Sequence, residues 1–311
     1  MRRAILGLMA ILLLVSAAHA AAPSVRVGIP SIVVTLLPLP VAQERGFFQE
    51  EGLTVQPVLM AAALNIKALL SGDVSYATTV GAAVSAAVRG IDVRVVMVFV
   101  DRPLFDLVGV PEVSSIADLR GRVVGISSRG GLMDHATRRM LQQSGVDPAG
   151  VTLVTLGPQS NVFTALEARR ITAGLLIPPY NFLAYRRGLK NLGFAGSFVS
   201  IPTTGLVTMR ERLERAPDQV RRMVRALARA RAFAREQKAA VLPILKRFLK
   251  LEDDAFLSEI YDYHQKAETP DGRISPALAA ETIREAREAE GLTRETPVGQ
   301  VFDFSYLEPR R

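Results

Sequence analysis

The stretch that organises the chain is VRVGIPSIVVTLLPLPVAQERGFFQEEGL, residues 25–53. Apolar residues alternate over 25–29 and predict a short strand, which runs into a loop of small, β-branched and proline residues. A helix through Val41 follows, and a second strand begins at Leu53. This βαβ unit is expected to have parallel strands. Because such sheets bind ligands beyond the carboxyl ends of their strands, residues 31–35 are expected at a ligand site.

Strand and helix patterns continue to alternate along the chain. Further strands are expected at 74–77, 93–100, 104–110, 122–126, 151–156, 173–177, 192–195 and 206–209, and helices at 62–70, 81–88, 132–143 and 160–170. From Pro217 to Glu290 the pattern is helical. This order predicts an α/β protein of two lobes, each a mainly parallel sheet flanked by helices, with a helical C-terminal tail on the first lobe. Residues 24–110 and 205–311 are assigned to the first lobe, and residues 111–204 to the second.

Residues 1–20 are typical of an export signal. Arg2 and Arg3 precede an apolar run over 4–17, and Ala18-His19-Ala20 is a small-residue cleavage site. The alternative is a membrane anchor, since the run approaches the length of a thin span. The alanine-rich end favours cleavage, so a periplasmic protein is expected.

Composition excludes several classes of protein. With 0 Cys, disulfides, thiolate metal sites and cysteine nucleophiles are ruled out. The net charge of +8 owes much to the arginine-rich stretch over 210–238. That stretch carries a helical apolar stripe, lacks interleaved aromatic residues and is interpreted as a solvated helix face. A nucleic-acid partner is therefore not expected.

Catalysis finds little support in the sequence. His135 and His264 are the histidines that follow the leader, and neither lies in a metal-binding spacing. Asp134 and His135 are adjacent, so on a helix they point about 100° apart and cannot form a self-contained pair. No G-x-S-x-G motif accompanies them. The sequence thus predicts no catalytic residue, no metal and no cofactor.

Hydroxyl and amide side chains gather at the predicted strand ends, with Asp101 and Asp134 as the few carboxylates nearby. A cationic ligand would need buried carboxylates or an aromatic cage, so a small anion or a neutral polar compound is expected. The apolar run over 32–37 suggests room for an apolar portion of this ligand. The inventory also contains Gln159, Ser160, Asn181 and Thr203, and the predicted contacts are Ser31, Thr35, Thr78, Thr79, Ser127, Ser128, Arg129, Tyr180 and Thr204.

Two alternatives stay open within this set. Thr78 and Thr79 lie between a strand and a helix. Capping of the helix N-terminus would explain one of the two threonines, so a ligand-binding role stays open for the pair. The loop Ser127-Ser128-Arg129 can hold one small oxyanion at a helix start. Arg129 either adds a charge-assisted hydrogen bond or reaches solvent.

The runs VRVGIP…PLPVAQERGFFQEEGLTV, ALLSGDVSYATT and DLRGRVVGIS, in this order, resemble the periplasmic binding proteins of nitrate, sulfonate and taurine transporters. That family also includes receptors for thiamine-pathway pyrimidines. The resemblance implies the type II periplasmic-binding-protein fold, a monomer, and delivery of a small solute to an ABC permease and ATPase in the inner membrane. Alternatives are a ligand-sensing module or an enzyme on the same fold. The pyrimidine synthases depend on a cysteine-rich motif that this chain lacks, and a dehydratase would need a pocket acid or base such as Asp101, Asp134 or His135.

Overall fold

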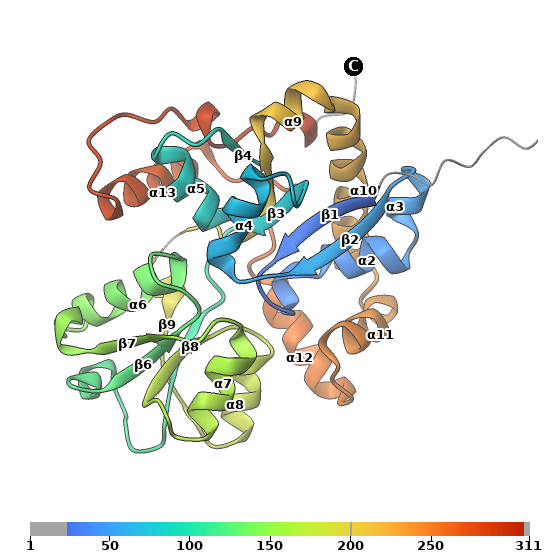
Figure 1. The fold of residues 1–311 in the computed structure, drawn as a ribbon. Helices are drawn as coiled ribbons and strands as arrows, with labels where there is room; N and C mark the ends of the chain where they lie inside the picture. The colour runs from blue at the N-terminus through green and yellow to red at the C-terminus, as the bar shows by residue number, and fades with distance from the viewer. Residues whose placement is uncertain (1–23, 200, 308–311) are drawn as a thin grey trace, which may run out of the picture.

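The computed structural model describes residues 24–199 and 201–307, which form two lobes that lie one above the other in Figure 1. The expected export signal over 1–20 lies outside the described residues. Each lobe is a five-stranded sheet flanked by helices, so the predicted two-lobed α/β architecture is confirmed.

The first sheet has the order β2-β1-β3-β10-β4. Its strands are β1 Ser24–Ile29, β2 Thr54–Leu59, β3 Tyr76–Thr79, β4 Val93–Val100 and β10 Thr204–Met209. β2, β1 and β3 are parallel, whereas β10 runs antiparallel to β3 and β4. Every residue of β4 is buried, as its unbroken apolar sequence predicts for a strand covered on both faces.

Helices from distant parts of the chain cover the first sheet. One face packs against α4 Ala62–Leu70, α5 Val80–Val88 and α13 Pro276–Ala289. The other face packs against α2 Pro38–Glu44, α3 Phe47–Glu50 and α10 Pro217–Glu236. The remaining helices of this lobe are α9 Arg210–Arg215, α11 Lys238–Leu249 and α12 Asp254–Gln265. The C-terminal helices therefore wrap the first lobe, as expected (Figure 1).

The second sheet has the order β7-β6-β8-β5-β9. Its strands are β5 Asp106–Gly109, β6 Val123–Ile126, β7 Thr152–Thr155, β8 Ala173–Leu176 and β9 Lys190–Phe194. α6 Leu132–Gln143 lies on one side of this sheet, and α7 Gln159–Glu167 and α8 Tyr180–Arg186 on the other (Figure 1). Short 3₁₀ turns complete the chain at η1 Val34–Leu36, η2 Ile116–Leu119, η3 Pro148–Gly150, η4 Ala195–Ser197, η5 Val298–Gln300 and η6 Ser305–Leu307.

One boundary of the predicted lobes is wrong. Residues up to 110 were assigned to the first lobe, but β5 pairs antiparallel with β8 and β9 in the second sheet. The chain therefore crosses between the sheets before β5, at the break that Asp101-Arg102-Pro103 makes in the strand pattern. It crosses back before β10 begins at Thr204. In each sheet, the strand that follows the crossing is the antiparallel one.

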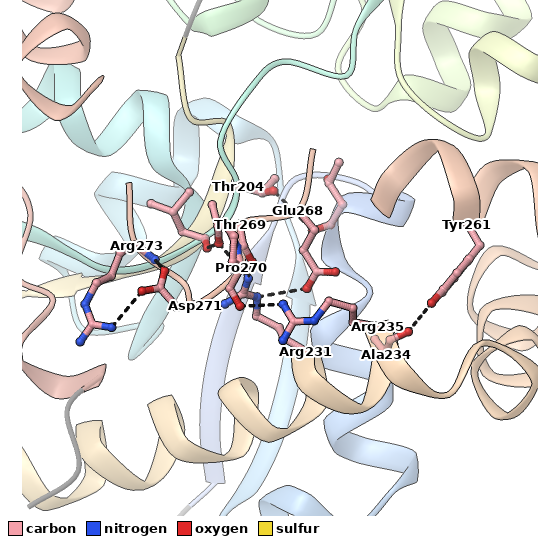
Figure 2. Close-up of polar contacts among 12 residues, drawn as sticks. Thr204, Arg231, Ala234, Arg235, Tyr261, Glu268, Thr269, Pro270, Asp271 and Arg273 are labelled. Carbon is pink, nitrogen blue, oxygen red and sulfur yellow. Dashed lines mark hydrogen bonds and ion pairs between the residues drawn. The ribbon is translucent and has the colours of Figure 1, made fainter. Parts of the chain in front are cut away.

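A segment after α12 extends the first sheet beyond β4. Thr269 donates from its backbone N to Phe99 O at 2.9 Å and from its hydroxyl to Val98 O at 2.6 Å. Arg231 of α10 reaches the same segment and forms a buried ion pair with Glu268 at 3.2 Å (Figure 2). The edge of the sheet next to the first crossing is therefore covered.

The basic helix α10 follows its sequence pattern except at Arg231, which is buried rather than solvated. Val220, Val224 and Leu227 are buried in the core. On the outer side, Arg225 pairs with Glu51 and Arg229 with Glu50, each at 2.6 Å. Across the described part of the chain, no helix is both long and apolar enough to cross a membrane.

Candidate functional site

A cavity of about 600 Å³ opens between the two lobes. It lies at the carboxyl ends of the parallel strands, where the first βαβ unit predicts a ligand site. Both lobes supply its lining. The first lobe contributes residues from 30–35, 61–70, 79–91 and 203–204, and the second contributes residues from 127–133 and 157–159, with Phe105 and Ile177.

Four helices begin at this cavity: α4, α5, α6 and α7. Their N-caps are Ala61, Thr79, Gly131 and Pro158, and none makes a side-chain capping hydrogen bond. An uncapped helix N-terminus presents N–H groups and the positive end of the helix dipole. Two of these N–H groups already have partners, since Val80 N of α5 donates to Thr203 O at 3.2 Å and Gln159 N of α7 donates to Ser31 Oγ at 3.4 Å. Four such helix N-termini around one cavity favour a ligand that carries negative charge or accepts hydrogen bonds.

Three threonines of the first lobe line the cavity with unused hydroxyls. The Oγ1 atoms of Thr35, Thr79 and Thr203 are buried, and no hydrogen-bond partner for them exists in the described part of the protein. Because a buried hydroxyl without a partner is destabilising, these groups are poised to bond a solute. Thr204, beside them, instead donates its hydroxyl to Thr35 O at 3.3 Å.

Gln159, at the start of α7, ties the two lobes together at the cavity. Its backbone N donates to Ser31 Oγ of the first lobe at 3.4 Å. Its side chain donates to Ser127 Oγ at 2.9 Å and accepts from Ile177 N at 3.1 Å. Gln159 thus fixes one predicted contact, Ser127, and touches another, Ser31.

The carboxylates at and beside the cavity have cationic partners. Asp134 accepts from Gly130 N at 2.8 Å and from Arg138 Nε at 2.7 Å, so it holds the 127–131 loop. Glu290, which lines the cavity, pairs with Arg89. Among the residues that the structure describes in this lining, Arg129 and Lys67, the latter at the exposed rim, make no ion pair. No unbalanced carboxylate of this lining is available to hold a cationic solute.

The predicted contacts divide into two groups. Ser31, Thr35, Thr79, Ser127, Ser128, Arg129 and Thr204 line the cavity, whereas Thr78 and Tyr180 do not. Thr78 is buried, and its hydroxyl donates to Gly28 O of β1 at 3.2 Å. Tyr180 packs against Phe163, with ring centroids 6.0 Å apart. Thr78 and Tyr180 therefore lie outside this lining, and the contacts described for their side chains are contacts within the fold.

Arg129 needs a separate description. Its backbone belongs to the cavity loop, but its guanidinium donates to Leu153 O of β7 at 3.0 Å. The charge of Arg129 is thus bound to a strand of its own lobe. Gln159 and Thr203 also line the cavity, but they were not among the predicted contacts. Gln159 lies at a helix start and Thr203 at a crossing between the lobes, and these positions could have indicated them in the sequence.

The apolar part of the lining differs from the expected one. Val34, Leu36 and Leu37 are fully buried in the core, so most of the apolar run over 32–37 does not face the cavity. The apolar lining comes instead from Val33, Ile66, Leu70, Ile91, Phe105, Leu132, Met133 and Ile177. These residues come from both lobes and give the cavity a partly hydrophobic lining.

None of the candidate acid and base residues Asp101, Asp134 and His135 lines this cavity. Asp101 pairs with Arg102 at 3.0 Å and does not line the cavity. His264 is completely buried in the first lobe, away from the lining. Within residues 24–199 and 201–307, no three His, Asp or Glu side chains are grouped closely enough to hold a metal ion.

Comparison with known proteins finds one matching family model and a curated relative. A family model described as NMT1/THI5 like matches residues 34–240. The riboflavin-binding protein RibY of Chloroflexus aurantiacus is 26% identical over 210 residues, which are 64% of this chain. The match spans 58% of the length of that relative.

Solved structures of similar shape cover almost the whole described chain. The alkanesulfonate-binding protein SsuA from Xanthomonas axonopodis pv. citri, bound to MOPS, has a TM-score of 0.74 at 18% identity, over 91% of this chain and 99% of its own. The periplasmic nitrate-binding protein NrtA from Synechocystis PCC 6803 has a TM-score of 0.74 at 13% identity, over 91% and 86%. At these identities the likeness establishes the fold.

Proposed function

The chain belongs to the NMT1/THI5-like family, and from this premise we propose that it is the extracytoplasmic solute-binding component of an ABC importer. It captures a small anionic or neutral organic solute between its lobes and delivers it to a permease and ATPase in the inner membrane. Solved proteins of the same fold bind an alkanesulfonate and nitrate, and a relative binds riboflavin. Their ligands differ, so the class of solute must be argued from this cavity.

The observation that carries the proposal is the cavity between the lobes, where four uncapped helix N-termini meet three unpartnered threonine hydroxyls. N–H and hydroxyl groups together can bond several oxygens of one sulfonate or carboxylate. A volume of about 600 Å³ exceeds the need of an inorganic anion and suits an organic solute. The apolar residues on α4 and α6 supply room for its body.

Closure follows from contacts on both sides of the cavity. A solute held by Thr35 and Thr79 of the first lobe and by Ser127 and Ser128 of the second stabilises the closed arrangement. The chain crosses between the sheets twice, near residues 101–105 and before Thr204. These two crossings are the hinge about which we propose that the lobes move.

The class of solute is tested by a thermal-shift screen of the mature protein. The compounds are MOPS, longer alkanesulfonates, nitrate, dicarboxylates, aromatic acids, pyrimidines, riboflavin and polyamines. We expect an organic anion or a neutral polar compound to give the largest rise in melting temperature. A polyamine as the sole hit would refute the proposed solute class, and no hit at all would count against the binding role.

Adjacent threonines provide a matched pair of variants for the site. Thr79→Val removes an unpartnered hydroxyl from the cavity, so affinity for the strongest hit should fall by about 10- to 100-fold with little loss of stability. Thr78→Val removes the hydroxyl that bonds Gly28 O, so it should cost about 1 kcal/mol of stability and leave affinity unchanged. Isothermal titration and urea denaturation measure the two effects. Equal affinities of Thr79→Val and the wild type would remove Thr79 from the site.

A further inference from the structure

A second, smaller cavity of about 270 Å³ lies beside the first and also joins the two lobes. α5 and α13 of the first lobe line one side of it, and the start of α6 lines the other. In Figure 1, α13 and α5 lie above α6 on the same side of the molecule. Any movement that closes the lobes changes the distance between α13 and α6.

The two helices carry opposite charges. α13 has Glu281, Glu285 and Glu288 at spacings of four and three residues, which places them on one helical face. α6 has His135 and Arg139, which are four residues apart and also share a face. His135, which shares its face of α6 with Arg139, lines the second cavity from one lobe, and Glu285 lines it from the other. The charged faces therefore confront each other across the lobes.

Two of the three glutamates already have a partner on their own helix. Arg284 of α13 pairs with both Glu281 and Glu288. Arg138 of α6 pairs with Asp134 at 2.7 Å. In the described structure Glu285 and Arg139 make no ion pair, and neither does His135; Glu285 belongs to the first lobe and Arg139 to the second.

The carboxylate of Glu285 lies in an unusual environment. Only 9% of the residue is exposed, it lines the second cavity, and its Oε2 atom is buried without a partner among the described residues. Burial raises the pKa of this carboxyl above its usual value. A buried carboxylate oxygen without a partner costs stability, and a guanidinium that approached it would recover that cost.

We propose that Arg139 and Glu285 form an inter-lobe latch that regulates solute capture. As the lobes close, the Arg139 guanidinium reaches the free oxygen of Glu285 across the second cavity, and the closed form gains an ion pair that the open form lacks. The latch biases the lobes toward closure with or without a solute, and so raises affinity for any solute that binds the closed form. The role of the latch in solute capture rests on the proposed function, whereas the ion pair between the lobes does not depend on it.

A charge-swap cycle on the solute-free protein tests the latch. Because the chain has 0 Cys, two dyes can be attached at Arg170→Cys in the second lobe and Glu236→Cys in the first, both exposed positions. Single-molecule energy transfer then reports the closed fraction. We expect Arg139→Glu or Glu285→Gln to shift the open–closed equilibrium toward the open form by about fivefold. The double variant Arg139→Glu/Glu285→Arg should restore the wild-type closed fraction.

Controls separate the latch from general effects of charge and from misfolding. Arg215→Glu reverses an exposed charge on α9 that pairs with Glu211, and it should leave the lobe distance unchanged. Raising NaCl should open the wild type and should have little effect on Arg139→Glu. The melting temperature identifies any variant that fails to fold. If Glu285→Arg fails to fold, Glu285→Gln still tests whether the carboxylate is needed for closure.

The outcomes distinguish the latch from the proposed function. If neither single variant changes the closed fraction, or if the swap does not restore it, the latch does not exist. If the cycle shows coupling while the thermal-shift screen yields no solute, the latch stands and the transport role fails. If solutes bind and the lobes show no coupling, the transport role stands alone.

Discussion

At the scale of single residues, His264 is a fully buried titratable group of the first lobe. It lies on α12, it is completely buried, and neither ring nitrogen has a hydrogen-bond partner among the described residues. Burial, and then the nearby charge of Arg231, lower the pKa of His264 to about 3. The folded protein therefore holds the neutral imidazole at physiological pH.

This burial predicts acid sensitivity. The pKa of His264 is lower in the folded than in the unfolded chain, so unfolding takes up a proton below about pH 6.5. The free energy of unfolding should thus decrease as pH falls from 6.5 toward 3, by an amount on the order of 4 kcal/mol. Urea denaturation at pH 7.5, 5.5 and 4.5 measures this loss.

The comparison that isolates His264 is His264→Leu, which removes the proton-binding group at similar volume. Its stability should fall less between pH 7.5 and 4.5 than that of the wild type. At pH 7.5 it should be as stable or more stable, because no hydrogen bond is lost. His135→Leu, at a half-buried position, is the matched control with a smaller effect. A wild-type pH slope in His264→Leu would show that other groups cause the acid sensitivity.

At the scale of elements, a buried polar contact joins α10 to the segment that covers β4. Arg231 pairs with Glu268 at 3.2 Å and donates to the Thr269 hydroxyl at 2.8 Å (Figure 2). Thr269 in turn bonds Val98 O, and Ala267 O accepts from Asp101 N at 3.1 Å, where the first crossing begins. The ion pair therefore holds the segment that covers β4, next to the point where the chain crosses to the second lobe.

Breaking this pair from one side should be costly. Arg231→Met leaves the Glu268 carboxylate buried without a partner, and we expect a loss of about 3–5 kcal/mol in the free energy of unfolding. Arg231→Met/Glu268→Leu removes both charges and should recover most of that loss. Urea denaturation of the three proteins at pH 7 provides the measurement. A double variant as unstable as the single one would show that Arg231 acts through Thr269 rather than through Glu268.

At the scale of the whole molecule, the direct bonds between the lobes at the main cavity are long. Val34 N donates to Pro178 O and Gln159 N to Ser31 Oγ, each at 3.4 Å. Long hydrogen bonds of this kind are weak and can be exchanged readily. Closure is therefore expected to depend on what fills the cavity.

This dependence predicts a coupled change in stability and shape. At about 100 times its dissociation constant, the strongest hit of the screen should add about 2.7 kcal/mol to the free energy of unfolding. The radius of gyration from small-angle X-ray scattering should decrease on the same titration. A stabilising compound that leaves the radius of gyration unchanged would contradict closure and would point to binding in an already closed cavity.

Local periodicity accounts for the elements that the sequence predicted well. The expected bounds of α4, α6 and β4 agree with the structure, because the apolar repeat of each element is complete within its own residues. The hydroxyl-rich strand ends likewise belong to single loops, so most predicted contacts reach the cavity. The family was also recognisable, since its segments keep their order along the chain.

Tertiary structure decided what depends on distant partners. β5 joined the second sheet because β8 and β9, far along the chain, offered the edges with which it pairs. Thr78 and Thr79 are neighbours in one strand, so they point to opposite faces, and only the packed lobes determine which face meets the cavity. By itself, the chain determined its elements, its family and the kind of groups at the strand ends. Which of those groups meet a solute depended on how the two lobes pack.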